Sequence, residues 1–585
     1  MLVDVSVPEI GIDALTYEAG SELHEGARVI VEVGRRKYAG FVLGEARKSL
    51  PPGISAKNVE GVIDDWPVVP RDIWDLAMWS ARVSMCGYAS ALKAALPLPV
   101  ITGGKLIPPP ENIGSPYVKF RERHCFNPFD RERVNFFADE MKSDIRTLVL
   151  FPRKDEAKSF FMSLPETLRN EAVLWPEESP KLWEAWKLIH SGQVRIVIAP
   201  PGGVFAPLCP GKIIVEDEAS PAHLIPYTLN LSARSLAGHR ASFLKAELIL
   251  AGHVPSLKTY VRAHPREILR PDRRNIILAD IHQSRKESLP GIEGNIPLTY
   301  TLTSRTHIEL GQGNNVIWIL NRTGESSEVF CENCGESVKC PKCGGLMMSL
   351  NDGGLLRCRH CGILREVPPK CEGCGFVLLT GKRPGLDSLA KIAGRYFSPV
   401  HVYDEHSDIT AMKGLILSTS RGLGLCGKIS PSLVAWLDLD SELWRPEYNS
   451  RCNVYRMLLT SYWRGRTRDS VRKVLIQGRR KGLGLAGYLA GGWTRFIPDE
   501  LRMRRDFLLP PYGYIAEIDC SSKILRGEIL DSLTEAGVFV MDPGEDERPL
   551  YVSCETLDEV RRVIEPKIFL RNTKKHYIHI TVRSE

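Results

Sequence analysis

The sequence predicts an α/β protein with two lobes, each built around a parallel sheet, a metal-binding insertion in the second lobe, a β-rich N-terminal unit and an α+β C-terminal unit. Apolar, strand-like runs alternate with longer helical patterns from 117 to 265, and a second set of such runs follows residue 274. This alternation is typical of parallel sheets with helical connections. Eight cysteines, all in Cys-x-x-Cys pairs, interrupt the second set between 331 and 374 and predict the insertion.

Residues 1–100 form the first predicted unit, a β-rich domain. Two runs rich in β-branched residues, 24–34 and 36–45, are separated by a Gly-Arg-Arg turn, which favours a pair of strands. A helical stretch, RDIWDLAMWSARVSM, follows them. Residues 101–116 (ITGGKLIPPPENIGSP) are rich in Pro and Gly, which predicts a linker.

The two lobes are predicted at 117–265 and 266–500, with the cysteine module at 331–375 inside the second lobe and the C-terminal unit at 501–585. The strand-like runs of the first lobe are 147–151, 194–200, 212–216 and 246–252. Those of the second lobe are 275–280, 315–320, 414–420 and 432–440.

The composition is that of an ordinary folded protein, with 43% hydrophobic and 25% charged residues and a mild net charge of +7. The first residues lack a basic and apolar secretion signal, and no apolar run approaches the length of about 18 residues that spans a bilayer. Of the 15 cysteines, those outside the paired block are scattered singly. This distribution favours metal binding in a reducing compartment, so we expect a cytoplasmic protein without membrane contact.

The four Cys-x-x-Cys turns predict two zinc ions, because each turn directs two thiolates at one point and two turns complete a tetrahedral site. Fourteen residues separate the second and third turns, enough for a hairpin, whereas only five separate the first and second. We therefore pair the inner turns with each other and the outer turns with each other. The predicted ligands are Cys340, Cys343, Cys358 and Cys361 for one ion, and Cys331, Cys334, Cys371 and Cys374 for the other. Free buried cysteines or a redox pair are the alternatives that this density of turns disfavours.

Several strings resemble the PriA family of primosomal proteins. VIWILNRTGESSEVFCENCG is similar to the family's LNRRGYA string before the first cysteine turn, and VFAPLCPGKIIVEDEAS resembles its FAPFxNLGLIIVDEEHD. AGHVPSLKTY and DFLLPPYGYIAEI resemble two further segments, and VSVPEIGIDALTY resembles the start of the family's N-terminal domain. The resemblance covers nearly the whole chain. It implies two RecA-like helicase lobes of superfamily 2, a 3′ DNA-end-binding domain and a role in restarting stalled replication forks.

The residues at the family's ATP-binding positions depart from the motor pattern. The TGSGKTE phosphate loop falls on 126–132, where Asp130 replaces the lysine and Arg131 the threonine. An aspartate at that position would repel a triphosphate, and the glycines that let the backbone wrap phosphates are absent. Glu216, Asp217 and Glu218 hold the place of the magnesium-binding acids, without the histidine that follows them in the family. In the family's arginine motif, only Arg468 is in register with an arginine finger.

Two further comparisons with the family bear on these predictions. GLGLCGKI (422–429) comes close to a phosphate loop, but Ile429 stands where Ser or Thr must meet magnesium, so we interpret it as a glycine-rich turn. The winged-helix domain that the family carries between its N-terminal domain and first lobe is missing, because only the predicted linker lies there. We therefore do not expect a working ATP and Mg²⁺ site.

Two regions are predicted to contact DNA. Among the positions of the family's 3′-end pocket, Gly34 and Lys57 match in type, whereas Leu15 and Thr16 replace Phe and Asp. Residues 451–481 contain ten cations against one acid, with aromatic residues between them. We predict contacts from Arg464, Arg466, Arg468 and Trp463, since phosphate attraction with stacking holds single strands. In the alternative interpretation, the aromatics face the core and the arginines pair with acids elsewhere.

Three functions are compatible with these residues. The best supported is a replication restart protein that binds forked or single-stranded DNA, recruits the replicative helicase and lacks ATPase activity. The alternatives are an active 3′→5′ helicase whose ATP site lies elsewhere, and a nuclease that uses the three acids at 216–218 for two-metal chemistry. The resemblance implies single-stranded-DNA-binding protein and a helicase loader as partners, and we expect a monomer.

Overall fold

The structure is a computed structural model. It describes the chain except for residues 47–52, 54, 65, 107, 109–118, 227–228, 282–297, 322–328, 332–335, 343, 351–353, 359–360, 378, 381–384, 405–406, 408, 410–411, 444–447, 479, 543–548, 572–577 and 584–585. The chain divides into two compact units. The first contains Met1–Cys125, Arg133–Pro265 and Arg504–Glu585, and the second contains Phe126–Glu132 and Arg266–Met503.

The first unit begins with a six-stranded, mainly antiparallel sheet in the order β5-β2-β1-β4-β3-β6. Its strands are β1 (Leu2–Val7), β2 (Ile12–Glu18), β3 (Arg28–Val33), β4 (Arg36–Glu45), β5 (Lys57–Asn58) and β6 (Gly61–Val62). Alternating residues such as Val3, Val5, Val29 and Val31 form the core of this sheet. Three helices follow: α1 (Arg71–Ser84), α2 (Tyr88–Ala95) and α3 (Leu98–Ile101). This part agrees with the β-rich fold predicted for the N-terminus.

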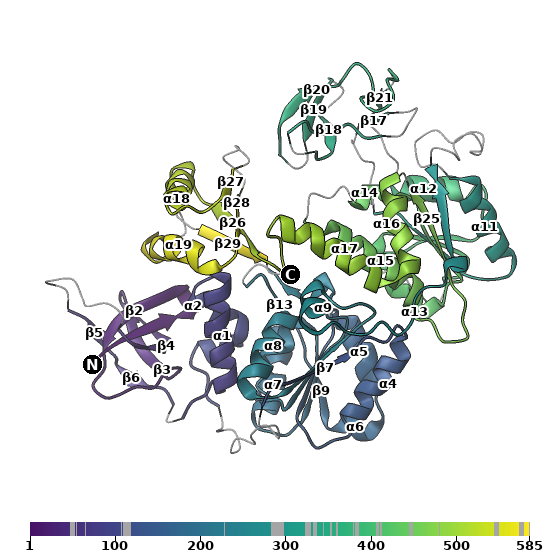
Figure 1. Ribbon diagram of the computed structural model, residues 1–585. Helices are drawn as coiled ribbons and strands as arrows, with labels where there is room; N and C mark the ends of the chain where they lie inside the picture. The colour runs from purple at the N-terminus through teal and green to yellow at the C-terminus, as the bar shows by residue number, and fades with distance from the viewer. Residues whose placement is uncertain are drawn as a thin grey trace. The chain divides into compact units, whose positions relative to one another are not determined.

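The first lobe contains a fully parallel sheet in the order β7-β14-β11-β8-β10-β9. Its strands are β7 (Arg121–Cys125), β8 (Thr147–Leu150), β9 (Ala172–Leu174), β10 (Ile196–Ala199), β11 (Lys212–Val215) and β14 (Glu247–Ala251). The helices are α4 (Asp130–Glu140), α5 (Lys154–Ser163), α6 (Glu166–Asn170), α7 (Ser179–His190), α8 (Ala233–Leu244) and α9 (Leu257–Ala263). Phe137 of α4 and Phe160 of α5 pack on Val149 and Ile214 at one face, while α7 and α8 lie on the other (Figure 1).

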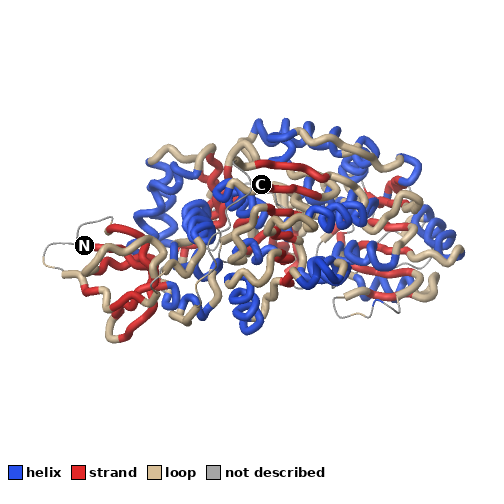
Figure 2. Tube along the Cα trace, turned by 90° about the horizontal axis from the view of Figure 1, so that it is seen from below, coloured by secondary structure: helices blue, strands red, loops and turns tan. Residues whose placement is uncertain are grey.

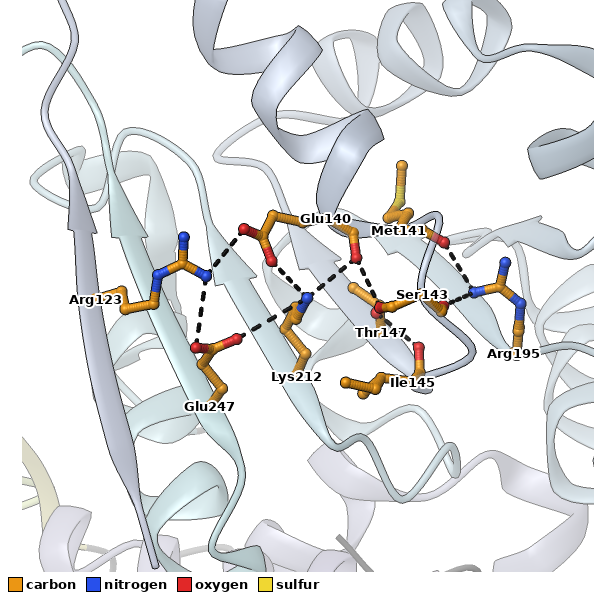
Figure 3. Close-up of polar contacts among 9 residues, drawn as sticks. All are labelled: Arg123, Glu140, Met141, Ser143, Ile145, Thr147, Arg195, Lys212 and Glu247. Carbon is orange, nitrogen blue, oxygen red and sulfur yellow. Dashed lines mark hydrogen bonds and ion pairs between the residues drawn. The ribbon is translucent and has the colours of Figure 1, made fainter. Parts of the chain in front are cut away.

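A buried charge network joins the amino ends of these strands, shown in Figure 3. Lys212 at the start of β11 lies 2.5 Å from Glu140 at the end of α4 and 3.9 Å from Glu247 at the start of β14. Arg123 of β7 contacts the same two carboxylates at 2.9 and 3.5 Å. The lysine is almost fully buried, so its charge depends on these partners. The network therefore ties α4 to three strands of the sheet.

The C-terminal part of the first unit is an antiparallel sheet in the order β27-β28-β26-β29. Its strands are β26 (Tyr514–Cys520), β27 (Val540–Met541), β28 (Leu550–Cys554) and β29 (Ile578–Arg583), and its helices are α18 (Lys523–Glu535) and α19 (Leu557–Arg571). Met85, just after α1, is part of the hydrophobic core of this domain together with Ile518 and Ile529.

The second unit contains another fully parallel sheet, in the order β15-β25-β24-β16-β23-β22. Its strands are β15 (Ile276–Asp280), β16 (Val316–Ile319), β22 (Val400–Val402), β23 (Leu415–Ser418), β24 (Leu433–Trp436) and β25 (Lys473–Gly478). The main helices are α11 (Tyr300–Gly311), α12 (Leu386–Ala393), α15 (Ser450–Trp463), α16 (Arg480–Gly491) and α17 (Trp493–Asp506).

Figure 2 shows the helices and strands of the chain by colour. Each of the eight strand-like runs named in the sequence contains an observed strand, from β8 at Thr147–Leu150 to β24 at Leu433–Trp436. The sequence-based fold class, α/β with parallel sheets, a β-rich N-terminal domain and a cysteine module, is therefore confirmed.

Candidate metal and nucleic-acid sites

The cysteine module is built from short antiparallel strands. β17 (Phe330–Cys331) pairs with β21 (Leu379–Thr380), and β18 (Met347–Leu350), β19 (Leu355–Cys358) and β20 (Leu364–Glu366) form a separate sheet. Met347 and Leu356 form a small core with three of the cysteines. A core of this size contributes little stability by itself, so the module depends on a further cross-link.

The four cysteine turns share one backbone hydrogen-bond pattern. The first cysteine of each turn donates its N–H to the carbonyl oxygen five positions later: Cys331 to Glu336 (2.8 Å), Cys340 to Gly345 (2.8 Å), Cys358 to Ile363 (2.9 Å) and Cys371 to Phe376 (2.7 Å). The glycine after each of the three described turns adopts a positive φ and donates its N–H back to the cysteine carbonyl: Gly344, Gly362 and Gly375. Glycine adopts this conformation readily because it has no Cβ. The turns are thus tight enough to direct their sulfur atoms inward.

The described thiols gather into two groups, within each of which the sulfur atoms lie within 4.8 Å of one another. The groups are Cys331, Cys371 and Cys374, and Cys340, Cys358 and Cys361. They are subsets of the two ligand sets predicted from the spacing; the remaining predicted ligands, Cys334 and Cys343, lie outside the described residues. Convergent thiolates suit Zn²⁺. Backbone N–H groups also point at sulfur, from Cys361 to Cys358 Sγ at 3.2 Å and from Gly373 to Cys371 Sγ at 3.4 Å, as thiolate ligands require. Both groups therefore fit a zinc ion.

Cysteines outside the module have a different environment. Burial raises the pKa of the Cys86, Cys125, Cys520 and Cys554 thiols to about 11, so these groups stay protonated at neutral pH. Among the residues that the structure describes, no group of three metal-ligating side chains forms outside the two cysteine groups.

The acids at the carboxyl end of β11 are held by arginines of the same lobe. The guanidinium of Arg133, from the first turns of α4, donates to both carboxylate oxygens of Glu216, with contacts of 2.6 to 3.1 Å. Arg133 is fully buried and Glu216 nearly so. The main-chain carbonyl of Glu216 also meets the ring of His223 at 2.8 Å. The first acid of the stretch is therefore neutralised inside the lobe.

Glu218, the third acid, is held in the same way. The guanidinium of Arg234, on α8, lies 2.8 Å from Glu218, and the backbone N–H of Ser256 donates to Glu218 at 2.7 Å. Asp217, between the two glutamates, is buried and has a left-handed backbone, with φ of 47°. Gly252 lies so close to this residue that a Cβ would meet Asp217 Cα at 3.2 Å. The whole acidic stretch is thus packed into the lobe.

The segment at the phosphate-loop position, Phe126–Glu132, belongs to the second unit. Asn127 accepts a hydrogen bond from the Phe129 N–H (3.0 Å) and donates to Glu132 (2.8 Å). The Asp130 carboxylate accepts the backbone N–H of Gly465 at 2.8 Å. This segment presents carboxylates where a phosphate cradle presents backbone N–H groups, and Arg131 beside them is exposed.

Arg468 is the residue predicted at the arginine-finger position. It forms an ion pair with Glu132, with distances of 2.7 and 2.9 Å, and its guanidinium lies over the ring of Phe129 at 5.1 Å. The hydrogen bonds from Arg468 and then Asn127 lower the pKa of Glu132. The structure therefore brings together Glu132, from the phosphate-loop position, and Arg468, from the arginine motif.

The other members of the predicted arginine surface lie beside Arg468. Arg466 donates to the Ser470 carbonyl and lies over the rings of Tyr462 (4.5 Å) and Trp463 (5.1 Å), and Arg464 is half-buried. Trp463 is only 5% exposed. The buried aromatic side chains follow the alternative interpretation, in which they face the core. Arg468 and Arg451 follow it as well, because they pair with acids elsewhere in the chain.

The two residues predicted at the DNA-end pocket are neighbours. Gly34, with a positive φ of 63°, closes the turn between β3 and β4, and the exposed Lys57 ammonium donates to its carbonyl at 3.1 Å. Lys57 also contacts Glu32 at 2.9 Å. On β2, Thr16 donates to Asp4 at 2.8 Å and Leu15 is exposed. The exposed lysine and the open glycine turn thus share one end of the sheet.

The glycine-rich stretch 422–429 follows strand β23. It forms a 3₁₀ helix (Ser420–Leu425) and a short helix, α13 (Cys426–Ile429). Gly465 packs against it: a Cβ there would meet the Cys426 carbonyl and Gly427 Cα at 2.4 Å. This contact, together with its φ of 70°, explains why glycine occupies position 465.

The sequence alone did not identify Arg133 and Arg234, the partners of the acids. Both lie in helices with mixed composition, where an arginine resembles any solvated charge. A usable signal was that a run of three acids at the end of a buried strand needs nearby cations once the magnesium-binding loop is lost.

The comparisons with known proteins point to one family. The family of PriA 3′ DNA-binding domains (3'BD) matches residues 3–97. The replication restart protein PriA of Rickettsia prowazekii is 22% identical over 590 residues, covering 89% of this chain and 88% of the relative. Along most of its length the chain is therefore similar to PriA proteins, and residues 3–97 match the family's 3′ DNA-binding domain.

Other PriA proteins match over shorter stretches. The PriA of Bacillus subtilis is 24% identical over 405 residues, and the PriA of Haemophilus influenzae is 24% identical over 358 residues. The chain spans about half the length of these two relatives, 50% and 49%. Among solved structures, S. cerevisiae Dbp5 bound to RNA and ADP BeF3 matches with a TM-score of 0.33 and 9% identity, over 74% of this chain and 97% of that chain, which is too distant to inform function.

The stretch that matches the 3′ DNA-binding domain, residues 3–97, contains the N-terminal sheet with Gly34 and Lys57. None of the described helices combines the length and apolar character needed to cross a membrane.

Proposed function

We propose that this chain is a PriA-type replication restart factor that binds forked or single-stranded DNA and recruits the replicative helicase without hydrolysing ATP. In this proposal it acts as a cytoplasmic monomer. The cysteine module holds two structural zinc ions, and the two lobes form a scaffold in place of a motor.

The observation that carries the proposal is the neutralisation of Glu216 and Glu218 by buried arginines. A nucleotide-driven motor uses acids at this strand end to hold magnesium on the triphosphate. Here the carboxylate oxygens of Glu216 are both hydrogen-bonded to Arg133. Freeing such a buried pair costs about 3–5 kcal/mol, because it leaves an uncompensated charge. Magnesium would also meet the positive charge of the arginine, so the site favours internal pairing over nucleotide.

DNA binding in this proposal uses two surfaces. The 3′ DNA-binding domain contributes the Lys57 ammonium, which can meet a phosphate, and the open turn at Gly34, which permits close approach of a strand. The second surface is the arginine surface, defined as Arg464, Arg466 and Arg468, where cations lie beside aromatic rings.

A cavity of about 560 Å³ in the first unit is the proposed docking place for a partner segment. The family resemblance implies single-stranded-DNA-binding protein and a helicase loader as partners. The cations that line the cavity already pair with acids, such as Arg234 with Glu218, Arg262 with Glu122 and Arg561 with Asp558. The aromatic rings of Trp79 and Tyr514 therefore offer the contact surface for the partner segment. The charged and aromatic lining consists of Trp79, Arg234, His239, Lys258, Arg262, Tyr514, Glu555, Asp558 and Arg561.

The test is the affinity for a labelled fork with a recessed 3′ end, measured by fluorescence anisotropy with and without a non-hydrolysable ATP analogue. The proposal predicts the same affinity in both cases. Replacing Lys57 by alanine weakens binding by about two- to ten-fold, because one charged hydrogen bond to DNA is lost. Lys37→Ala is the matched control, since Lys37 lies on the same sheet and pairs with Glu60. Binding that changes with the nucleotide, or equal effects of the two lysines, would contradict the proposal.

A further inference from the structure

The segment Phe126–Glu132 contacts the arginine surface through carboxylates and an aromatic ring, the same kinds of group that a nucleic acid presents. Two of its carboxylates meet donors of residues 463–468: Asp130 accepts the Gly465 N–H at 2.8 Å, and Glu132 pairs with the Arg468 guanidinium at 2.7 Å. Phosphate oxygens of a nucleic acid use the same two kinds of donor, backbone N–H groups and arginine.

The aromatic ring of Phe129 lies in the same segment as these two carboxylates, and in a nucleic acid each phosphate is likewise followed by an aromatic base. Phe129 and Trp463 form a T-shaped pair with ring centroids 5.6 Å apart and an interplanar angle of 82°. The other neighbour of Phe129 is the Arg468 guanidinium, at 5.1 Å from the ring centroid. Single strands are held by this combination of arginine and aromatic contacts.

The contact has an exposed ion pair at its edge and a buried aromatic centre, where Phe129 is 5% exposed. The side chains of Arg468 and Glu132 are 63% and 35% exposed, whereas Trp463 is 5% exposed. Exposed ion pairs contribute little stability because water screens them. The outer pair can therefore be exchanged for another anion at small cost, whereas release of the buried Phe129 requires a partner that replaces its contacts and would uncover the indole of Trp463.

We propose that Phe126–Glu132 is an internal nucleic-acid mimic that covers the arginine surface until a single DNA strand displaces it. The inference rests on the proposed function, since it requires the arginine surface to bind DNA. The segment that relatives use as a phosphate loop thus serves here as an autoinhibitory contact on the second unit. Its two carboxylates stand in for phosphates and Phe129 stands in for a base.

The charge on Glu132 provides the sharpest test. Glu132→Gln keeps the shape of a partly exposed side chain and removes only the competing charge. The variant is expected to bind fluorescein-labelled oligo(dT) about two- to five-fold more tightly, the range that corresponds to one exposed ion pair. The plot of log affinity against log salt becomes steeper by about 0.7, as for one additional phosphate contact on a single strand. Glu178→Gln is the matched control, because Glu178 pairs with Lys181 at the surface of the first unit.

The same measurement in an Arg468→Ala background separates the inference from the proposed function. If both are correct, Arg468→Ala weakens oligo(dT) binding and Glu132→Gln has no further effect in that background. If Arg468→Ala weakens binding while Glu132→Gln in the otherwise native chain gives no increase beyond the control, the mimic is wrong and the DNA surface stands. If Arg468→Ala leaves affinity unchanged, the arginine surface does not bind DNA and both ideas fail.

Hydrogen exchange gives an independent readout on the native chain. Saturating oligo(dT) is expected to accelerate amide exchange in peptides that span 126–132, because the segment loses its packing against Trp463 and Arg468 when it leaves. Slower or unchanged exchange in this segment, with the oligonucleotide bound, would show that DNA does not displace it and would overturn the inference.

Discussion

Replacing Arg133 by methionine tests the internal neutralisation of the acidic stretch. The substitution keeps the length and apolar contacts of the side chain and removes the guanidinium. Glu216 would then keep its negative charge in a position where its side chain is about 10% exposed, without the donor that now contacts both oxygens.

Removing one partner of a buried pair costs about 3–5 kcal/mol. For a lobe of this size, 1 kcal/mol corresponds to about 2–4 °C, so the melting temperature of the first lobe is expected to fall by roughly 6–20 °C. The double variant Arg133→Met with Glu216→Leu should recover most of this loss, because replacing a whole buried pair by apolar side chains is often neutral.

The assay is thermal unfolding together with hydrogen exchange of peptides from β11, which reports on this lobe within a multi-part chain. Lys142→Met is the control, since Lys142 and Asp139 form a pair at 2.7 Å with both side chains 67% exposed. It should cost less than about 1 kcal/mol. Equal effects of the two single variants would refute the reasoning. Stabilisation of the native protein by magnesium and ATP would refute it as well, because it would show that Glu216 is available to metal.

Two further predictions concern zinc and pH. Cys358→Ser is expected to lower the zinc content from two ions per chain to one and to make the module sensitive to proteases. The control variant Cys86→Ser should leave the zinc content unchanged. Equal metal content in the two variants, measured by mass spectrometry, would contradict the assignment. Burial raises the pKa of Glu140, but hydrogen bonds and charge from Lys212 and then Arg123 outweigh it, so the pKa lies below the ordinary value of 4.5. A carboxyl with a lowered folded-state pKa stabilises the protein above its unfolded-state pKa, and this stability is lost as the pH falls through the folded-state value. Glu140→Gln should therefore flatten the decline of melting temperature below about pH 4.5, and a decline as steep as in the native chain would argue against this network.

Much of the fold followed from the sequence because the buried strands are continuous apolar runs. TLVLF and KIIVE correspond to β8 and β11. β7 was not identified, because its sequence, RERHC, is charged. It is an edge strand, and its Arg123 is part of the charge network in Figure 3. β25, with the sequence KVLIQG, was not identified because it follows a segment dominated by arginine.

Among the candidate sites, those built from residues close in sequence could be predicted, and those built from distant residues could not. The cysteine turns could be predicted because their spacing is local and the chemistry of thiolates restricts their use. The partners of the acids could not, since Arg133 meets Glu216 across 83 positions of sequence. The pairing of Glu132 with Arg468 spans 336 positions and depends on the docking of Phe126–Glu132 on the second unit. Contacts of this range are set by tertiary packing, which local patterns do not encode.

The most direct test of a DNA-binding scaffold without a motor is DNA-stimulated ATP hydrolysis by the zinc-loaded protein, with binding to a forked substrate read in the same tube. The account predicts fork binding with no turnover above the background without protein. Turnover that is stimulated by the fork and abolished by Glu218→Gln would contradict it, because that result requires the acidic stretch to act on magnesium and ATP.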